Sequence, residues 1–288
     1  MKKGFIVWSI LLLLTTNALA VFFGSINPKY ITFVDVFILI CLSFIFRVYN
    51  NKTAIVIFIF CIVARTLIWY DFKNNISRDP WTLSKSYQVR GLDLSHHNGD
   101  INFDKINFID FVFLKATEGS TWNDKAFTKN YSAFKKKKIE VGAYHFFRFD
   151  VDGKIQARNF LSHLKGKEFN LPLIVDVEQN SNPFTSRSQV ITRLKDFVNE
   201  IKNRTGSKPI IYTNGIGYSL FIFGEFDDHP LWLSATNSIL PSIINCKFWQ
   251  FNITGVLPEL SHEADLNVFK GSRKEWEEYL KNQKGYKL

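Results

Sequence analysis

The segment LPLIVDVE, residues 171–178, decides the fold of this chain. Its first part is almost wholly apolar, which is typical of a strand buried on both faces, as in a parallel sheet. It ends on two carboxylates, Asp176 and Glu178. These residues are two positions apart, so their side chains point to the same side if both lie on the strand. The segment therefore predicts a buried strand with a paired acidic end.

Short apolar runs like this one alternate with amphipathic segments from residue 89 onward. The expected strands cover residues 89–95, 111–117, 141–147, 171–178, 209–214, 231–236, 247–251 and 264–269. The expected helices cover residues 124–138, 153–164, 186–204 and 272–281. Strands separated by helices favour an α/β fold with a covered parallel sheet, and about eight of them favour a TIM-like (β/α) barrel. Few helices are expected after residue 204, so the barrel is expected to be irregular there.

The active site of such a barrel gathers at the carboxyl ends of its strands. Polar residues fall at or near the ends of several expected strands, namely Asp93, Tyr144, Tyr212 and Asp265. Two like charges at the mouth of a buried strand repel, so the pair in segment 171–178 holds one proton tightly. A protonated acid beside an ionised carboxylate is what a glycosidase uses. Most Asp-x-Glu pairs are solvated strand ends, so this pattern alone does not establish the chemistry.

The first 70 residues are of a different kind. Three apolar runs, from Phe5 to about Phe23 and over residues 31–46 and 54–70, predict a membrane segment with two or three transmembrane helices. The first run also resembles a cleavable signal peptide, because two lysines precede it and residues 18–20 read Ala-Leu-Ala. Polar residues 71–88 are expected to form a linker to the domain 89–288.

Basic residues predict the orientation of these helices. Lys2, Lys3, Arg47 and Lys52 fall on one side of the membrane and only Lys29 on the other. Because positively charged loops stay in the cytoplasm, everything after Tyr70 is expected on the extracytoplasmic side of the cytoplasmic membrane. Cleavage of the first run leaves this orientation unchanged.

Charge narrows the classes of partner. Residues 1–87 hold nine basic and three acidic residues, a net of +6, and residues 88–288 hold 27 and 23, a net of +4. The domain is too weakly basic for a nucleic-acid footprint, although a mild positive charge favours polyanions. His96 and His97 have no further ligands at a familiar spacing, so neither a metal nor a cofactor is expected.

Seven segments occur in a characteristic order along the domain. They are GLDLSHHNGDINF (91–103), FVFLKATEGSTWNDKAFTKN (111–130), VGAYHFF (141–147), LPLIVDVE (171–178), PIIYTN (209–214), FWQF (248–251) and ADLNVF (264–269). Together they resemble the glycoside hydrolase family 25 lysozymes, muramidases of the N,O-diacetylmuramidase type, over about residues 90–270. The resemblance implies an irregular β/α barrel with several antiparallel strands at its end. It also implies hydrolysis of the β-1,4 bond between N-acetylmuramic acid and N-acetylglucosamine, so peptidoglycan glycan strands are the expected partner.

The resemblance also assigns roles to individual residues. Glu178 matches the general acid and Asp176 its catalytic partner, while Asp93 and Asp265 complete the acidic cluster. The residues expected to bind substrate are Tyr144, Tyr212, Gln250 and Trp232. For the tryptophan, packing in the core is an equally good interpretation.

The leading hypothesis is therefore a membrane-anchored lysozyme that acts outside the cytoplasm. One alternative is a non-catalytic peptidoglycan-binding membrane protein, which would have no need of four matching carboxylates. A second alternative is a membrane assembly factor whose helices carry the function, although the short loops between the apolar runs show no transport motif.

Overall fold

The computed structural model describes residues 79–236, 245–283 and 285–288. The chain divides into two units between Thr82 and Leu83. The three apolar runs predicted to span a membrane lie outside the described residues. Within the described ranges, no helix has both the length and the apolar character needed to cross a bilayer. The second unit begins at Leu83, so it includes the end of the segment predicted as a linker.

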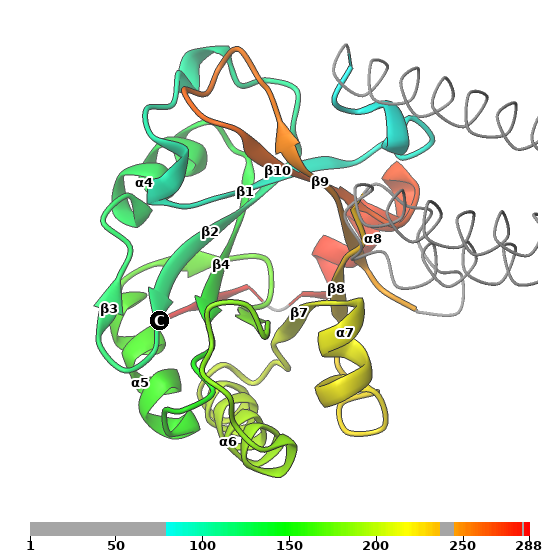
Figure 1. The fold of residues 1–288 in the computed structure, drawn as a ribbon. Coiled ribbons are helices and arrows are strands. Elements are labelled where there is room, and N and C mark those ends of the chain that lie inside the picture. Colours follow the sequence, from blue (N-terminus) through cyan, green and yellow to red (C-terminus); the bar gives the residue numbers. More distant parts are fainter. Residues whose placement is uncertain (1–78, 237–244, 284) are drawn as a thin grey trace, which may run out of the picture. The chain divides into compact units, whose positions relative to one another are not determined.

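A closed barrel forms the centre of the second unit (Figure 1). In the described part of the chain, its eight strands in spatial order are β1 (Arg90–Leu94), β2 (Phe111–Glu118), β4 (Glu140–Phe146), β6 (Ile174–Asp176), β7 (Ile210–Asn214), β8 (Leu231–Ser234), β9 (Phe248–Gly255) and β10 (Ala264–Phe269). The barrel closes because β1 pairs with β2 on one side and with β10 on the other. The α/β barrel predicted from the sequence is thus confirmed.

One barrel strand runs against the others. Strand β10 is antiparallel to both β9 and β1, whereas all other neighbours around the barrel are parallel. The resemblance implied several antiparallel strands at the end of the barrel, and this was wrong for the described residues. The connection between β9 and β10 is a short turn with no helix, which permits only an antiparallel pairing.

Helices surround the barrel where the sequence predicted them. They are α4 (Phe127–Lys136), α5 (Gly153–His163), α6 (Arg187–Thr205) and α8 (Arg273–Asn282), with a short α7 (Gly215–Gly217). The 3-10 turns are η2 (Thr82–Ser84), η3 (His96–Asn98) and η4 (Phe103–Lys105), and η5 (Tyr218–Ile222) is a π-helical turn. Short strands outside the barrel are β3 (Trp122–Asn123), β5 (Glu168–Phe169) and β11 (Tyr286–Lys287). After α6 the described helices are short or few, as the sequence predicted.

The deciding segment forms a shorter strand than expected. Strand β6 begins at Ile174 because Pro172 has no N–H to contribute to the ladder. It ends at Asp176, so Glu178 lies past the last strand residue. The prediction that both carboxylates lie on one strand was therefore wrong for Glu178. The chain turns there, and the Asn182 side chain donates to the Glu178 carbonyl at 2.8 Å.

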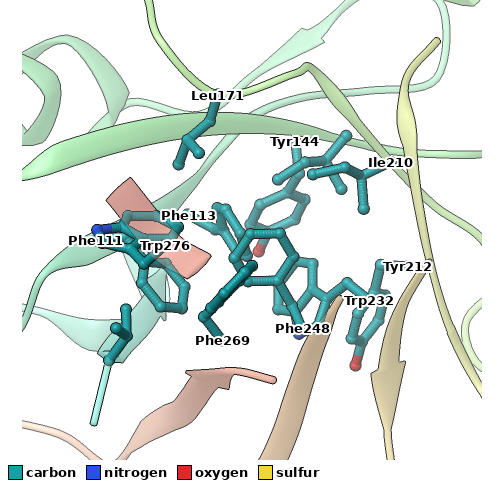
Figure 2. Close-up of a cluster of buried hydrophobic side chains, with 12 residues drawn as sticks. Phe111, Phe113, Tyr144, Leu171, Ile210, Tyr212, Trp232, Phe248, Phe269 and Trp276 are labelled. Carbon is teal, nitrogen blue, oxygen red and sulfur yellow. The ribbon is translucent and has the colours of Figure 1, made fainter. Parts of the chain in front are cut away.

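Aromatic side chains fill the barrel below its mouth (Figure 2). Phe113 packs against Trp232 and Phe248, with ring centroids 4.6 and 5.0 Å apart. Gly91 makes room for this packing, because a Cβ there would lie 2.4 Å from the Phe111 ring. Trp276 of α8 packs on Phe111 and is only 4% exposed. The core thus occupies the lower barrel and leaves the carboxyl ends of the strands to polar residues.

Candidate active site

Two of the predicted carboxylates face each other across one ladder. Asp93 of β1 pairs directly with Asp265 of β10. The Gln250 side-chain amide donates to both of them, at 3.0 Å to Asp93 Oδ2 and 3.2 Å to Asp265 Oδ2. Asn267 adds a second donor to Asp93 Oδ2 at 2.7 Å. The antiparallel β10 is what brings these two acids side by side, although they are far apart in the sequence.

This pair divides its charge unequally. Burial raises the pKa of both carboxyls and lifts that of Asp265 well above its usual range. Hydrogen bonds from Asn267 and Gln250 pull the pKa of Asp93 back down. The negative charge of Asp93 further raises the pKa of Asp265. Asp265 therefore holds the proton while Asp93 carries the charge.

The other two carboxylates lie across the barrel mouth on the β6 side. Asp176 is 6% exposed, whereas Glu178 is only partly buried at the rim. Burial raises the pKa of Asp176 well above its usual range, and the charge of Glu178 raises it further. Burial also raises the pKa of Glu178, with the charge of Asp93 as the next cause. Two carboxyls that repel each other hold one proton more tightly, as the sequence predicted for this pair.

Tyr212 connects the two acidic groups. Its hydroxyl donates to Gln250 Oε1 at 2.8 Å, and it is also a hydrogen-bond neighbour of Glu178. Burial and the charge of Glu178 raise the pKa of Tyr212 well above its usual range. Burial and the charge of Asp93 do the same for Tyr144. Both tyrosines therefore stay protonated and can donate hydrogen bonds at the mouth of the barrel.

Trp232 occupies a different place from the other predicted substrate-binding residues. It is 1% exposed, and its indole N–H donates to Asn267 Oδ1 at 2.8 Å. Its ring packs 4.3 Å from that of Tyr212 (Figure 2). This arrangement matches the core-packing interpretation, in which Trp232 supports Tyr212 from below. Direct contact between Trp232 and sugar stays a prediction.

Three further residues of the site were not singled out from the sequence. Asn267 binds Asp93, Asn214 binds Glu178, and the ammonium of Lys115 lowers the pKa of both Asp176 and Glu178. A signal for the first two was present, because each stands two positions after a predicted site residue on the same strand. Strand alternation places such residues on one face.

The rim segment that carries Glu178 is fixed by one side chain. Asn182 Nδ2 donates to the carbonyls of Glu178 and Phe147, at 2.8 and 3.0 Å. Its Oδ1 accepts from the Phe149 N–H at 2.8 Å. These three bonds tie the turn after β6 to the end of β4. They replace the ladder hydrogen bonds that Glu178 lacks.

Comparison with known proteins decides the family. The model of the glycosyl hydrolases family 25 matches residues 92–260, which is more than half of the chain. The chain belongs to this family. The protein is therefore an enzyme, a glycoside hydrolase of the lysozyme and N,O-diacetylmuramidase class.

Individual relatives agree with this assignment. Lysozyme M1 of Streptomyces globisporus is 31% identical over 201 residues, covering 64% of this chain and 68% of that protein. The uncharacterized protein YegX of Escherichia coli is 28% identical over 204 residues, covering 68% of this chain and 74% of that protein. The structure of a family 25 glycosyl hydrolase from Bacillus anthracis superposes with a TM-score of 0.62 at 31% identity, covering 68% of this chain and 94% of that one.

Proposed function

We propose that this protein is a membrane-anchored muramidase that hydrolyses the β-1,4 bond between N-acetylmuramic acid and N-acetylglucosamine in peptidoglycan. The observation that carries the proposal is the carboxylate arrangement at the barrel mouth. The pKa values of Asp176 and Glu178 are both raised, and Asp93 and Asp265 lie on the opposite strands. A glycosidic bond needs an acid and a carboxylate together, and family 25 supplies the substrate class.

Glu178 acts as the general acid in this proposal. It lies at the accessible rim, and its raised pKa keeps it protonated at a pH where an ordinary glutamate is ionised. It protonates the leaving glycosidic oxygen, and the negative charge of Asp93 stabilises the positive charge that develops on the sugar. Tyr212 and Asn214 then stabilise the carboxylate that Glu178 becomes, because both lower its pKa.

Asp176 acts on the anomeric side of the bond. Its Oδ1 is buried and has no hydrogen-bond partner among the described residues. A buried acceptor without a donor is costly, so a substrate N–H that reaches it is bound firmly. The acetamido N–H of the sugar supplies such a donor. This observation favours the mechanism in which Asp176 guides the acetamido oxygen onto the anomeric carbon over the one in which it activates water.

The membrane location rests on the sequence. The apolar runs within residues 1–70 and the distribution of basic residues between them support an anchor in the cytoplasmic membrane, with the barrel outside the cytoplasm. Fractionation of cells that express the full chain tests this. The protein should stay in the membrane after a high-salt, alkaline wash and should be cut by protease added to spheroplasts. Release by the wash, or protection from the protease, would contradict it.

Clearing of a cell-wall suspension separates a hydrolase from a binding protein. The full chain should clear the suspension, and Glu178→Gln should do so about 100- to 10,000-fold more slowly, the usual contribution of a general acid. The variant should still sediment with the wall. Glu277→Gln, at an exposed carboxylate of α8, is the matched control and should clear at the wild-type rate. Wild-type protein that sediments with the wall without clearing it would overturn the proposal.

A further inference from the structure

A cavity of about 450 Å³ lies at the carboxyl ends of β1, β2 and β4. Its volume falls within the range of about 300–1,000 Å³ that is usual for ligand sites. It is lined by Lys115, Glu118, Trp122, Arg148 and the two histidines His96 and His97. Lys115 connects the cavity to the carboxylate site, because its side chain lines the cavity and its charge lowers the pKa of Asp176 and Glu178.

Among the side chains that line the cavity, two cations, Lys115 and Arg148, stand against one carboxylate, Glu118. One carboxylate, Glu118, lies between two cations, with Lys115 Nζ at 2.9 Å and Arg148 Nη1 at 3.6 Å. Arg148 Nη1 also donates a hydrogen bond to the Ser181 carbonyl, which holds the guanidinium at the wall. Asp124 does not line the cavity; it lies behind the wall, where it is buried and accepts a hydrogen bond from the His96 backbone N–H. Asp150 lies 3.7 Å from the Nε of Arg148 and does not line the cavity.

An aromatic surface accompanies these cations. Trp122 is 39% exposed, and the Lys115 ammonium lies 4.9 Å from its ring centroid. Gly119 keeps Arg148 at the wall, since a Cβ at this position would lie 3.1 Å from Arg148 Cγ. Its φ of +54° also favours glycine. The cavity thus combines a guanidinium, an ammonium and an open indole face next to a strongly acidic site.

We propose that this cavity is the subsite that recognises the acidic substituent of muramic acid, with Arg148 and Lys115 binding its carboxylate and Trp122 packing on its apolar part. The inference rests on the proposed function and adds which end of the substrate the enzyme recognises. Muramic acid bears a lactyl group with a carboxylate, either free or extended by an acidic stem peptide, whereas N-acetylglucosamine bears none. The planar fork of arginine suits a carboxylate.

The subsite also fixes the direction in which the glycan lies. The carboxylates at the barrel mouth repel an anionic substituent, whereas the adjacent cavity attracts it. A glycan that binds with muramic acid beside the cavity places its carboxylate near the cations and away from the site carboxylates. A glycan bound in the reverse direction loses the attraction of the cations and does not avoid the repulsion. Uncharged β-1,4 glycans gain nothing from the cavity.

Three soluble glycans of equal length test the proposal with the purified full chain. The first keeps its stem peptides, the second is peptide-free with a free lactyl carboxylate, and the third has that carboxylate converted to a neutral methylamide. The wild type should show a kcat/KM about tenfold higher on a carboxylate-bearing glycan than on the methylamide, the effect of one charge-assisted hydrogen bond. A preference already present with the peptide-free acid identifies the lactyl carboxylate. A preference that needs the peptide identifies the stem carboxylates.

Two variants link this preference to the cavity. Arg148→Gln should bring the ratio between charged and neutral glycans close to one. Because Arg148 also donates to the Ser181 carbonyl, a purely structural defect would lower both rates alike. Thr121→Glu, at an exposed wall residue, adds a repelling charge and should reverse the preference. Arg158→Gln, at an exposed arginine of α5, is the matched control and should keep the wild-type ratio.

The outcomes separate this inference from the proposed function. Equal wild-type rates on charged and neutral glycans would overturn the subsite while leaving the muramidase intact. A Thr121→Glu variant that keeps the wild-type ratio would also overturn it, whatever Arg148→Gln does to folding. Failure of the wild type to cut any of the three glycans would instead overturn the proposed function.

Discussion

At the scale of single residues, the activity depends on how each carboxylate keeps or loses its proton. Glu178 must be protonated to act as the acid, so activity should fall as the pH rises through its pKa. Burial and the charge of Asp93 raise that pKa, while Tyr212 and Asn214 lower it by stabilising the ionised form. The balance of these opposing effects sets the alkaline limit of activity.

Removal of the Tyr212 hydroxyl should move this limit. Tyr212→Phe takes away a hydrogen bond that favours ionised Glu178, so the pKa of Glu178 should rise further. The alkaline limb of the kcat/KM profile is therefore expected to shift to higher pH, together with a loss of rate. Tyr218→Phe, on η5, serves as the matched control and should leave the limb in place. A shift to lower pH after Tyr212→Phe would show that Glu178 is not the acid.

Asp265 should reduce stability at neutral pH. Its pKa is higher in the folded protein than in the unfolded chain, so folding is favoured at low pH and this contribution is lost as the pH rises through the folded pKa. Asp265→Asn removes that cost and keeps a donor for Asp93. The melting temperature at pH 7 should rise by about 2–4 °C, which corresponds to roughly 1 kcal/mol. The gain should shrink in acid, and a gain that grows there would contradict this assignment.

At the scale of elements, the sequence predicted the barrel well because each strand is a short apolar run and each early helix is amphipathic. Every expected strand and helix is present. The ends of β6 were less predictable, since Pro172 delays its start and a turn after Asp176 removes Glu178 from the ladder. The site carboxylates could be located from motifs. The contribution of Lys115 could not, because it depends on which strand ends adjoin around the barrel.

The turn after β6 should be a determinant of rate. Asn182→Ala removes the three side-chain bonds that tie Glu178 to the end of β4. A misplaced acid lowers kcat more than it changes KM, and a loss of about 10- to 100-fold is expected because small displacements of a catalytic group are costly. The test is to measure kcat, KM and the free energy of unfolding of Asn182→Ala beside those of the wild type.

A suitable comparison for that variant is Asn170→Ala. Asn170 is an exposed asparagine that donates to Glu140 at the start of β4, away from the barrel mouth. It should keep the wild-type kcat. Equal losses in the two variants would show that the Asn182 bonds matter only for stability.

At the scale of the whole molecule, the barrel separates stability from chemistry. Aromatic side chains fill its lower part (Figure 2). The carboxylates and their amide partners lie at its mouth. Trp276 of α8 belongs to the lower part, where it packs on Phe111 and Phe269 at ring distances of 5.5 and 5.2 Å. Replacing a large core side chain in the lower part with alanine should therefore lower stability and leave the geometry of the site in place.

Trp276→Ala tests this separation. The free energy of unfolding should fall by about 3–5 kcal/mol, as for other large aromatic truncations in a core. The kcat of the molecules that remain folded should stay near the wild-type value at low temperature. Val256→Ala, at a side chain that is 70% exposed, should change neither quantity. A large loss of kcat without a loss of stability would show that the two ends of the barrel are not separable.

The most direct test of the central claim is mass spectrometry of the fragments that the full chain releases from purified peptidoglycan. Wild-type protein should release fragments with muramic acid at the reducing end, and Glu178→Gln should release almost none. Fragments that end in reducing glucosamine, or equal release by the variant, would contradict a muramidase whose acid is Glu178.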